Sequence, residues 1–181
     1  MSLAPVGQTF VLNQKLFSIG GSLWIEDGNG NHVFEVDGKA LSIRRSLLLK
    51  DTSGNELYEI NKSLAHVHKT FEIKKGGTVV ATIQQALMSM FGQKFTITAA
   101  NGDQLKVTGN WRAREFHIQQ NGADVIQVSR KYFSMHGSYG IQILPGFDVP
   151  MALAIVVALE QIEVEEGRGE GVHLGLGGLT S

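Results

Sequence analysis

Two histidines separated by one residue have the type and spacing that best suit metal chemistry in this sequence. His66 and His68 lie two positions apart, and residues two apart on a β-strand point to the same face. Two imidazoles on one face supply two ligands for a transition metal, and His117 and His136 are candidates for a third. The simpler interpretation, two solvent-facing strand residues beside Lys69, is favoured because nothing in the sequence brings a third ligand close. A histidine-dependent enzyme therefore stays an alternative, and no cofactor is expected.

Basic residues, several of them adjacent, suggest a second kind of site. They are Arg44, Arg45, Lys74, Lys75, Arg112, Arg114, Arg130 and Lys131. Each cation close to an anionic membrane contributes about 1 kcal/mol to binding, so these residues are the candidate contacts to an anionic phospholipid or a phosphoinositide. The alternative is an ordinary solvated face. Glu72 and Glu115 lie close by in the sequence, and adjacent residues of a strand point to opposite faces.

No arrangement of residues is typical of catalysis. Ser18, Ser42 and Ser134 recur periodically, whereas a nucleophile is one serine with a base beside it. Trp111 adjoins Arg112, a combination that can stack on bases or sugars, but a tryptophan in a β-sheet wall is the favoured interpretation. The sequence therefore predicts no catalytic residue and a non-enzymatic protein.

The amino-acid composition limits the kinds of binding partner and the cellular compartment that we expect. The chain has 181 residues, which suits one domain, with 16 basic and 17 acidic residues. Nucleic-acid-binding domains are usually strongly basic, so no nucleic acid is expected as a partner. The sequence has no cysteine, which excludes disulfides and thiolate metal sites and fits a reducing compartment. The first residues lack the pattern of a secretory signal. We therefore expect a cytoplasmic protein, either soluble or peripheral at a membrane.

A short sequence motif, here called the repeated phrase, recurs along the chain and indicates the secondary structure that carries these residues. The phrase has the form Lys-x-Leu-Ser or Lys-x-Phe-Ser, with looser versions at Lys62 and Gln85, and its copies begin at Lys15, Lys39, Lys62, Gln85 and Lys131. Their starts are separated by 24, 23, 23 and 46 residues, which leaves room for a degenerate copy near Gly109-Asn110-Trp111. Asn-Gly and Gly-Gly turn signals lie between the copies, flanked by alternating polar and apolar residues. Two strands per unit predict about 12 antiparallel strands, and closure into a barrel would remove the exposed edges.

The pattern changes to a helix at residue 148. Asp148 is a suitable N-cap, and the run from Val149 to Leu159 contains 11 residues without a charge. A helix that is apolar on every side must be buried on every side, and a bilayer span needs about 20 residues. A barrel of about 12 strands is too wide for its own side chains to fill. We therefore predict that a helix over residues 148–166 fills the barrel, with a membrane anchor as the alternative, and that residues 167–181 form a flexible glycine-rich tail.

Several of these segments together resemble one known family. They are the Lys-x-Phe-Ser phrase, Val36-Asp37-Gly38-Lys39, Ser129-Arg130-Lys131-Tyr132-Phe133-Ser134, Tyr139-Gly140 and the closing helix after Asp148. Over residues 8–166 the chain resembles the LURP-one-related family. The resemblance implies a tubby C-terminal-like fold, shared in outline with phospholipid scramblases, in which a twelve-stranded barrel surrounds a C-terminal helix. Plant members are linked to pathogen defence. Tubby domains bind phosphoinositides, but no lipid-contacting motif carries over residue by residue.

The expected function is a binding or scaffold module that docks to an anionic phospholipid surface or to a protein partner. The resemblance also implies an alternative of another class, a membrane-attached, scramblase-like protein whose C-terminal helix inserts into the bilayer. Four glutamates mark the predicted end of the helix, where it emerges into water: Glu160, Glu163, Glu165 and Glu166. They oppose the helix dipole and are a candidate surface for a cation or a basic partner.

Overall fold

A computed structural model describes residues 7–13, 21–38, 46–63, 70–86, 95–132 and 138–174, with side chains of the final helix up to Glu165. Within these residues, twelve strands, one short 3-10 helix and one long α-helix follow one another. They are β1 (Gln8–Asn13), β2 (Ser22–Asp27), β3 (His32–Asp37), β4 (Ser46–Asp51), β5 (Glu56–Ser63), β6 (Thr70–Lys75), β7 (Thr78–Gln85), β8 (Phe95–Ala99), β9 (Gln104–Asn110), β10 (Glu115–Gln120), β11 (Ala123–Ser129), η2 (Arg130–Tyr132), β12 (Ser138–Ile143) and α2 (Val149–Leu174).

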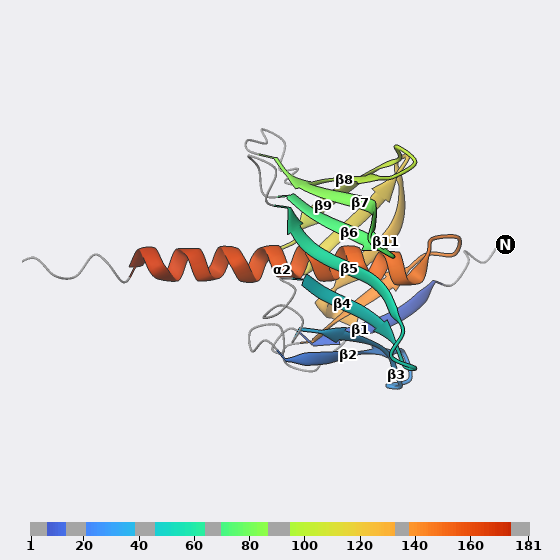
Figure 1. Ribbon diagram of the computed structural model, residues 1–181. Coiled ribbons are helices and arrows are strands. Elements are labelled where there is room, and N and C mark those ends of the chain that lie inside the picture. Colours follow the sequence, from blue (N-terminus) through green and yellow to red (C-terminus); the bar gives the residue numbers. More distant parts are fainter. Residues whose placement is uncertain are drawn as a thin grey trace, which may run out of the picture.

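The strands form one closed antiparallel barrel, and α2 runs through it (Figure 1). Each strand pairs with its neighbours in the chain, and β1 pairs with β12 from Gln8↔Ile143 to Asn13↔Ser138 to complete the ring. Closure leaves no sheet edge to associate with another chain. The predicted fold, about 12 antiparallel strands closed into a barrel around a C-terminal helix, is confirmed.

The β2–β3 and β4–β5 hairpins show how side-chain hydrogen bonds stabilise the tight turns between successive strands. The Asp27 carboxylate accepts hydrogen bonds from the backbone and side-chain N–H groups of Asn31, at 2.9 Å each. Asp51 receives the same bonds from Asn55 at 2.9 and 2.8 Å. Gly30 supplies the positive φ that closes the first turn. Hydrogen bonds from Asn31 and Asn55 lower the pKa of Asp27 and Asp51, respectively.

The barrel has two ends, and α2 passes from one to the other. The hairpin end carries the β2–β3, β4–β5, β6–β7, β8–β9 and β10–β11 turns and the start of α2. The exit end, where α2 leaves the barrel, carries the connections of β1–β2, β3–β4, β5–β6, β7–β8, β9–β10 and β11–β12. Most of the repeated sequence phrase falls in exit-end connections outside the described residues, and the β9–β10 turn is the connection there that is described in full.

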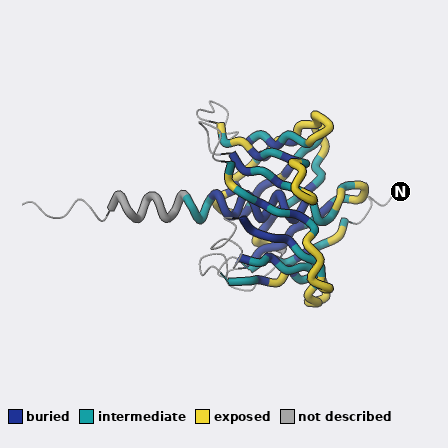
Figure 2. Tube along the Cα trace, viewed as in Figure 1, coloured by how far each residue is buried: buried dark blue, intermediate teal, exposed yellow. Residues whose placement is uncertain are grey.

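The interior of the barrel is filled by α2 and the inward side chains of the wall. From Ala152 to Ile162, no residue of α2 is more than 7% exposed, and Figure 2 shows this part of the helix as buried throughout. Inward residues from β1 to β12, such as Leu12, Ile73 and Ile141, complete the apolar core. Burial on all sides explains why this helix has no polar face over its first turns.

The wall also fixes the start of α2. Asp148 caps the helix by accepting a hydrogen bond from the Met151 backbone N–H at 2.9 Å, as its sequence position predicts. The Tyr58 hydroxyl of β5 donates to the same carboxylate oxygen at 3.1 Å. Burial and the adjacent Asp148 charge raise the pKa of Tyr58 to about 12.

The predicted end of the helix is wrong. The structure continues α2 to Leu174, eight residues past the predicted end at Glu166, so residues 167–174 are helical and not a tail. This stretch contains glycines but no proline. Glycine lowers helix propensity by about 1 kcal/mol but keeps its N–H donor, so it need not end a helix. Residues 175–181 lie outside the described part. No helix in the described residues is long and apolar enough to cross a membrane.

Candidate binding surface at the helix exit

A buried group of opposite charges joins α2 to the wall at the exit end. We call Arg114, Glu160 and Glu163 the Arg114 ion cluster. The Arg114 guanidinium donates to both carboxylate oxygens of Glu160, through Nε at 3.0 Å and Nη2 at 2.9 Å. Its Nη1 donates to Glu163 at 2.8 Å, and Nη2 also contacts the second oxygen of Glu163. Two-point pairing of this kind is the strongest and most directional form of ion pair in proteins.

The cluster is closed to water on its inner side. The side chains of Arg114 and Glu160 are 3% and 4% exposed, whereas Glu163 is 24% exposed. Burial raises the pKa of Glu160, and the Arg114 charge opposes that shift. Tyr139 of β12 lies beside Glu160, and burial followed by the Glu160 charge raises the pKa of its phenol well above the ordinary value. The two-point pairing with Arg114 offsets the cost of burying the Glu160 charge.

The backbone of the β9–β10 turn aims Arg114 inward. Arg114 has φ +56°, the left-handed conformation that most side chains avoid. Its N–H donates to the Trp111 carbonyl at 3.1 Å, and the Asn110 side chain accepts from the Ala113 N–H at 3.1 Å. Gly109 adopts φ +101° where an added Cβ would lie 2.7 Å from the Glu115 carbonyl. A residue held in this strained state indicates a specific role.

A second ion pair holds α2 further out. Lys62 at the end of β5 donates to Glu165 at 2.9 Å, with side chains 42% and 28% exposed. Glu160, Glu163 and Glu165 therefore have basic partners in the wall. Because α2 continues to Leu174, these glutamates lie within the helix and not at its end, and Arg114 and Lys62 offset their charge.

Three basic residues lie on the solvent-exposed surface of the exit end. Arg112, Arg130 and Lys131 are exposed and occupy the two neighbouring connections that flank β10 and β11. The Arg112 guanidinium lies 5.6 Å from the centre of the Trp111 ring. The Glu115 carboxylate accepts from the Arg130 backbone N–H at 3.0 Å, which fixes the backbone there. We call Arg112, Arg130 and Lys131 the exit cations.

Comparison with known proteins decides the family of this chain. The family model described as LURP-one-related matches residues 8–160. The chain belongs to the LURP-one-related family. No curated protein matches it.

The LURP-one-related fold is also seen in a solved structure. An X-ray structure of a protein from Arabidopsis thaliana has a TM-score of 0.67 and is 20% identical, with 88% of this chain and 93% of that chain covered. At this level of identity the likeness extends to the fold alone.

Two other predicted basic residues, Lys74 and Lys75, do not share one surface with the exit cations. Lys74 and Lys75 end β6 at the hairpin end, opposite the exit. Lys74 contacts Glu72 at 3.3 Å, and Lys75 lies 5.7 Å from the centre of the Tyr58 ring. Arg44 and Arg45 lie outside the described residues.

The prediction that Arg114 contributes to an exposed anion-binding surface is wrong. The guanidinium is buried and paired with two carboxylates of α2, so it is not available to an external anion. Sequence analysis also missed Glu160 and Lys62 as residues that hold the helix. One signal was available, because Glu160 and Glu163 are three residues apart and so share one helix face.

The histidine prediction remains untested. His66, His68 and His136 lie outside the described residues. On the outer wall, the His117 ring lies 2.8 Å from the Asp124 carboxylate. Gln119 donates a hydrogen bond to the same carboxylate at 2.8 Å, and this bond is the main cause of the lowered pKa of Asp124. Within the described ranges, no group of three or more His, Asp or Glu residues is placed to hold a metal ion.

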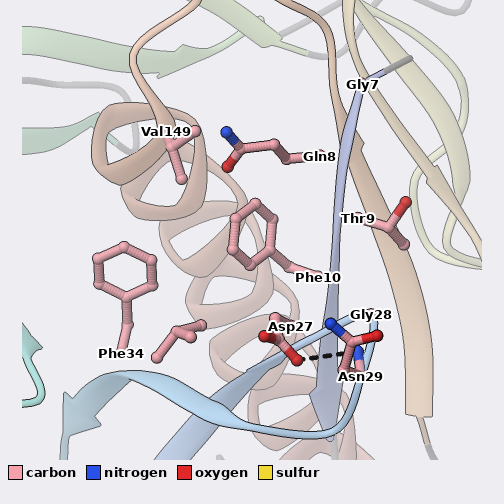
Figure 3. A pocket seen from close by; sticks show the side chains of 10 residues that line it. Gly7, Gln8, Thr9, Phe10, Asp27, Gly28, Asn29, Phe34 and Val149 are labelled. Carbon is pink, nitrogen blue, oxygen red and sulfur yellow. Dashed lines mark hydrogen bonds between the residues drawn. The ribbon is translucent and has the colours of Figure 1, made fainter.

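A groove of about 920 Å³ lies at the hairpin end, beside the first turn of α2 (Figure 3). Phe10 and Phe34, whose ring centres are 6.1 Å apart, form its apolar part with Val149. Asp27 and Asn29 lie at its polar edge. None of the predicted binding residues lines this groove.

Proposed function

We propose that this LURP-one-related protein is a non-catalytic binding module that docks peripherally onto an anionic phospholipid surface with its exit end. The observation that carries the proposal is the filled interior. Because α2 and the wall side chains occupy the barrel from Ala152 to Ile162, ligand contacts belong to the outside of the wall or to its ends.

Charge favours the exit end among these surfaces. The exit cations are exposed at this end. The charges of the nearby carboxylates Glu160, Glu163 and Glu165 are offset by Arg114 and Lys62. At about 1 kcal/mol each, three cations give a weak association that falls steeply with salt. We also propose a cytoplasmic location, at the periphery of a membrane.

Co-sedimentation with vesicles tests the proposal. Purified full-length protein is mixed with neutral, phosphatidylserine-containing or phosphoinositide-containing vesicles at two salt concentrations. The test variant is Arg112→Gln/Arg130→Gln/Lys131→Gln. The matched control is Lys74→Gln/Lys75→Gln/Lys106→Gln, which removes as many charges from the hairpin end and from the exposed side of β9.

The proposal expects salt-sensitive binding to anionic vesicles, at least about tenfold weaker for the exit-end variant and little changed for the control. Equal losses in both variants would show that net charge, and not the exit end, determines binding. No binding to any vesicle would contradict the lipid proposal and direct the search to protein partners.

A further inference from the structure

A tryptophan on the outer wall has no partner in the core. Trp24 is 39% exposed, and among the described residues Val79 is the other large apolar side chain exposed to this degree. Its neighbours Leu23 and Ile25 point inward and are buried, so the alternation of β2 turns the Trp24 ring outward. Tryptophan is among the residue types most enriched at the energetic centres of protein interfaces.

The ring is held in place before any partner arrives. It stacks on His32 of β3 with ring centres 5.0 Å apart and planes 10° from parallel. His32 in turn lies 3.5 Å from the carboxylate of Glu26. A register shift between Ile25 and Glu26 pairs Glu26 with His32 and brings this imidazole to the tryptophan. Because the ring is already ordered, binding loses little side-chain entropy.

The charges around Trp24 define the kind of group that would complement it. Glu35 lies directly opposite Trp24 in the β2–β3 register, and Glu26 follows two residues along β2. Lys50 on β4 donates to Asp37 at 2.6 Å, and this hydrogen bond raises the pKa of Lys50. Lys50 is also the cross-strand neighbour of Glu35, but Glu26, Glu35 and Asp37 together outnumber this one cation, so the outer surface around the ring is net negative. The face of an indole also attracts cations.

We propose that the Trp24 face, defined as Trp24, Glu26, His32 and Glu35, binds an arginine side chain in a basic segment of a protein partner. A guanidinium is planar, stacks on an indole and presents N–H groups in the geometry of a carboxylate. Lysine offers a point charge without that plane. In the barrel, β1 and β12 separate β2 from β11, so this face is distinct from the exit cations.

Titration with short peptides tests the inference on the full-length protein. The probe is the capped peptide Gly-Arg-Gly-Arg-Gly, compared with counterparts that carry lysine or the neutral arginine analogue citrulline. The readout is the NMR signal of the Trp24 indole N–H, which can be assigned by substitution because the chain has two tryptophans. Trp24→Ala and Glu35→Gln are the test variants. Val79→Ala and Glu59→Gln are the controls, since they make comparable changes elsewhere on the wall.

The inference expects saturable shifts with the arginine peptide, affinity about three- to fivefold lower for the lysine peptide and for Glu35→Gln, and no saturable binding of the citrulline peptide. Trp24→Ala, checked for a native unfolding transition, should lose arginine-peptide binding when followed through backbone amide shifts. Equal binding of the citrulline peptide, or equal losses in the controls, would overturn the inference. Vesicle binding of Trp24→Ala should be unchanged, and its loss would instead assign this face to the membrane.

Discussion

Arg114 is a cation that the fold keeps inside, in a backbone conformation few side chains adopt. Its guanidinium is satisfied by Glu160 and Glu163 of α2 and by the Arg112 carbonyl, to which Nη1 donates at 2.6 Å. A buried pair gains little net stability, because desolvation offsets the attraction, but removing one partner leaves a charge stranded. The cluster therefore specifies how α2 sits in the barrel.

We predict that Arg114→Met lowers the free energy of unfolding by about 3–5 kcal/mol, because Glu160 is then buried without a partner. Arg114→Met/Glu160→Leu should recover most of that loss. Lys62→Met, which removes the exposed pair with Glu165, should cost less than about 1 kcal/mol. Urea unfolding followed by circular dichroism measures all three. A loss below about 1 kcal/mol for Arg114→Met would show that the cluster does not hold the helix.

The roles of single residues were the least predictable from sequence. Arg112 and Arg114 are two positions apart and look equivalent in the sequence, yet one is exposed and the other buried. The difference depends on the positive φ of Arg114 in the β9–β10 turn and on carboxylates 46 and 49 residues further along the chain. The positive φ has no local sequence signal, and the three-residue spacing of Glu160 and Glu163 does not by itself identify Arg114 as their partner.

Among the elements, α2 has two parts with different surroundings. From Ala152 to Ile162 it is enclosed by the wall, and from Glu163 onward it emerges. The apolar run predicted the enclosed part because only complete burial accommodates it. The emerging part was predicted to end too early, since glycines were taken as the end of the helix.

We predict that Leu153→Ala, at a position with no exposure, destabilises the protein by about 2–5 kcal/mol through the cavity it leaves. Val164→Ala is the matched control in the emerging part, where the side chain is half-buried, and should cost about 1 kcal/mol or less. Thermal and chemical unfolding give both values. Equal costs at the two positions would contradict a helix enclosed only over its first turns.

The strands were predictable because their evidence repeats along the chain. A unit of about 23 residues with turn signals between the copies gave the number of strands and their antiparallel order. It was harder to predict at which end of the barrel a given side chain lies. Lys75 and Arg112 both looked like parts of one basic surface. In an antiparallel barrel, however, successive connections alternate between the two ends, so the β6–β7 turn with Lys75 and the β9–β10 turn with Arg112 lie at opposite ends.

On the scale of the whole molecule, the barrel is a closed wall around an occupied interior. The two proposed binding surfaces, the exit cations and the Trp24 face, are both outside and separated along the barrel. We therefore propose that a membrane and a protein partner can be bound at the same time. In both proposals α2 stays inside the barrel. They differ in this from the alternative hypothesis, in which α2 leaves the barrel and inserts into the bilayer.

The central claim is that the protein binds with α2 in place, and a cross-link at the exit end tests it most directly. The chain has no cysteine, so Lys62→Cys/Glu165→Cys introduces the only two thiols, at an exposed ion pair between β5 and α2. A short bismaleimide joins them, and the same variant blocked with N-ethylmaleimide is the control. The account predicts equal binding of linked and blocked protein to anionic vesicles. Loss of binding in the linked protein alone would show that α2 must leave the barrel, and would contradict it.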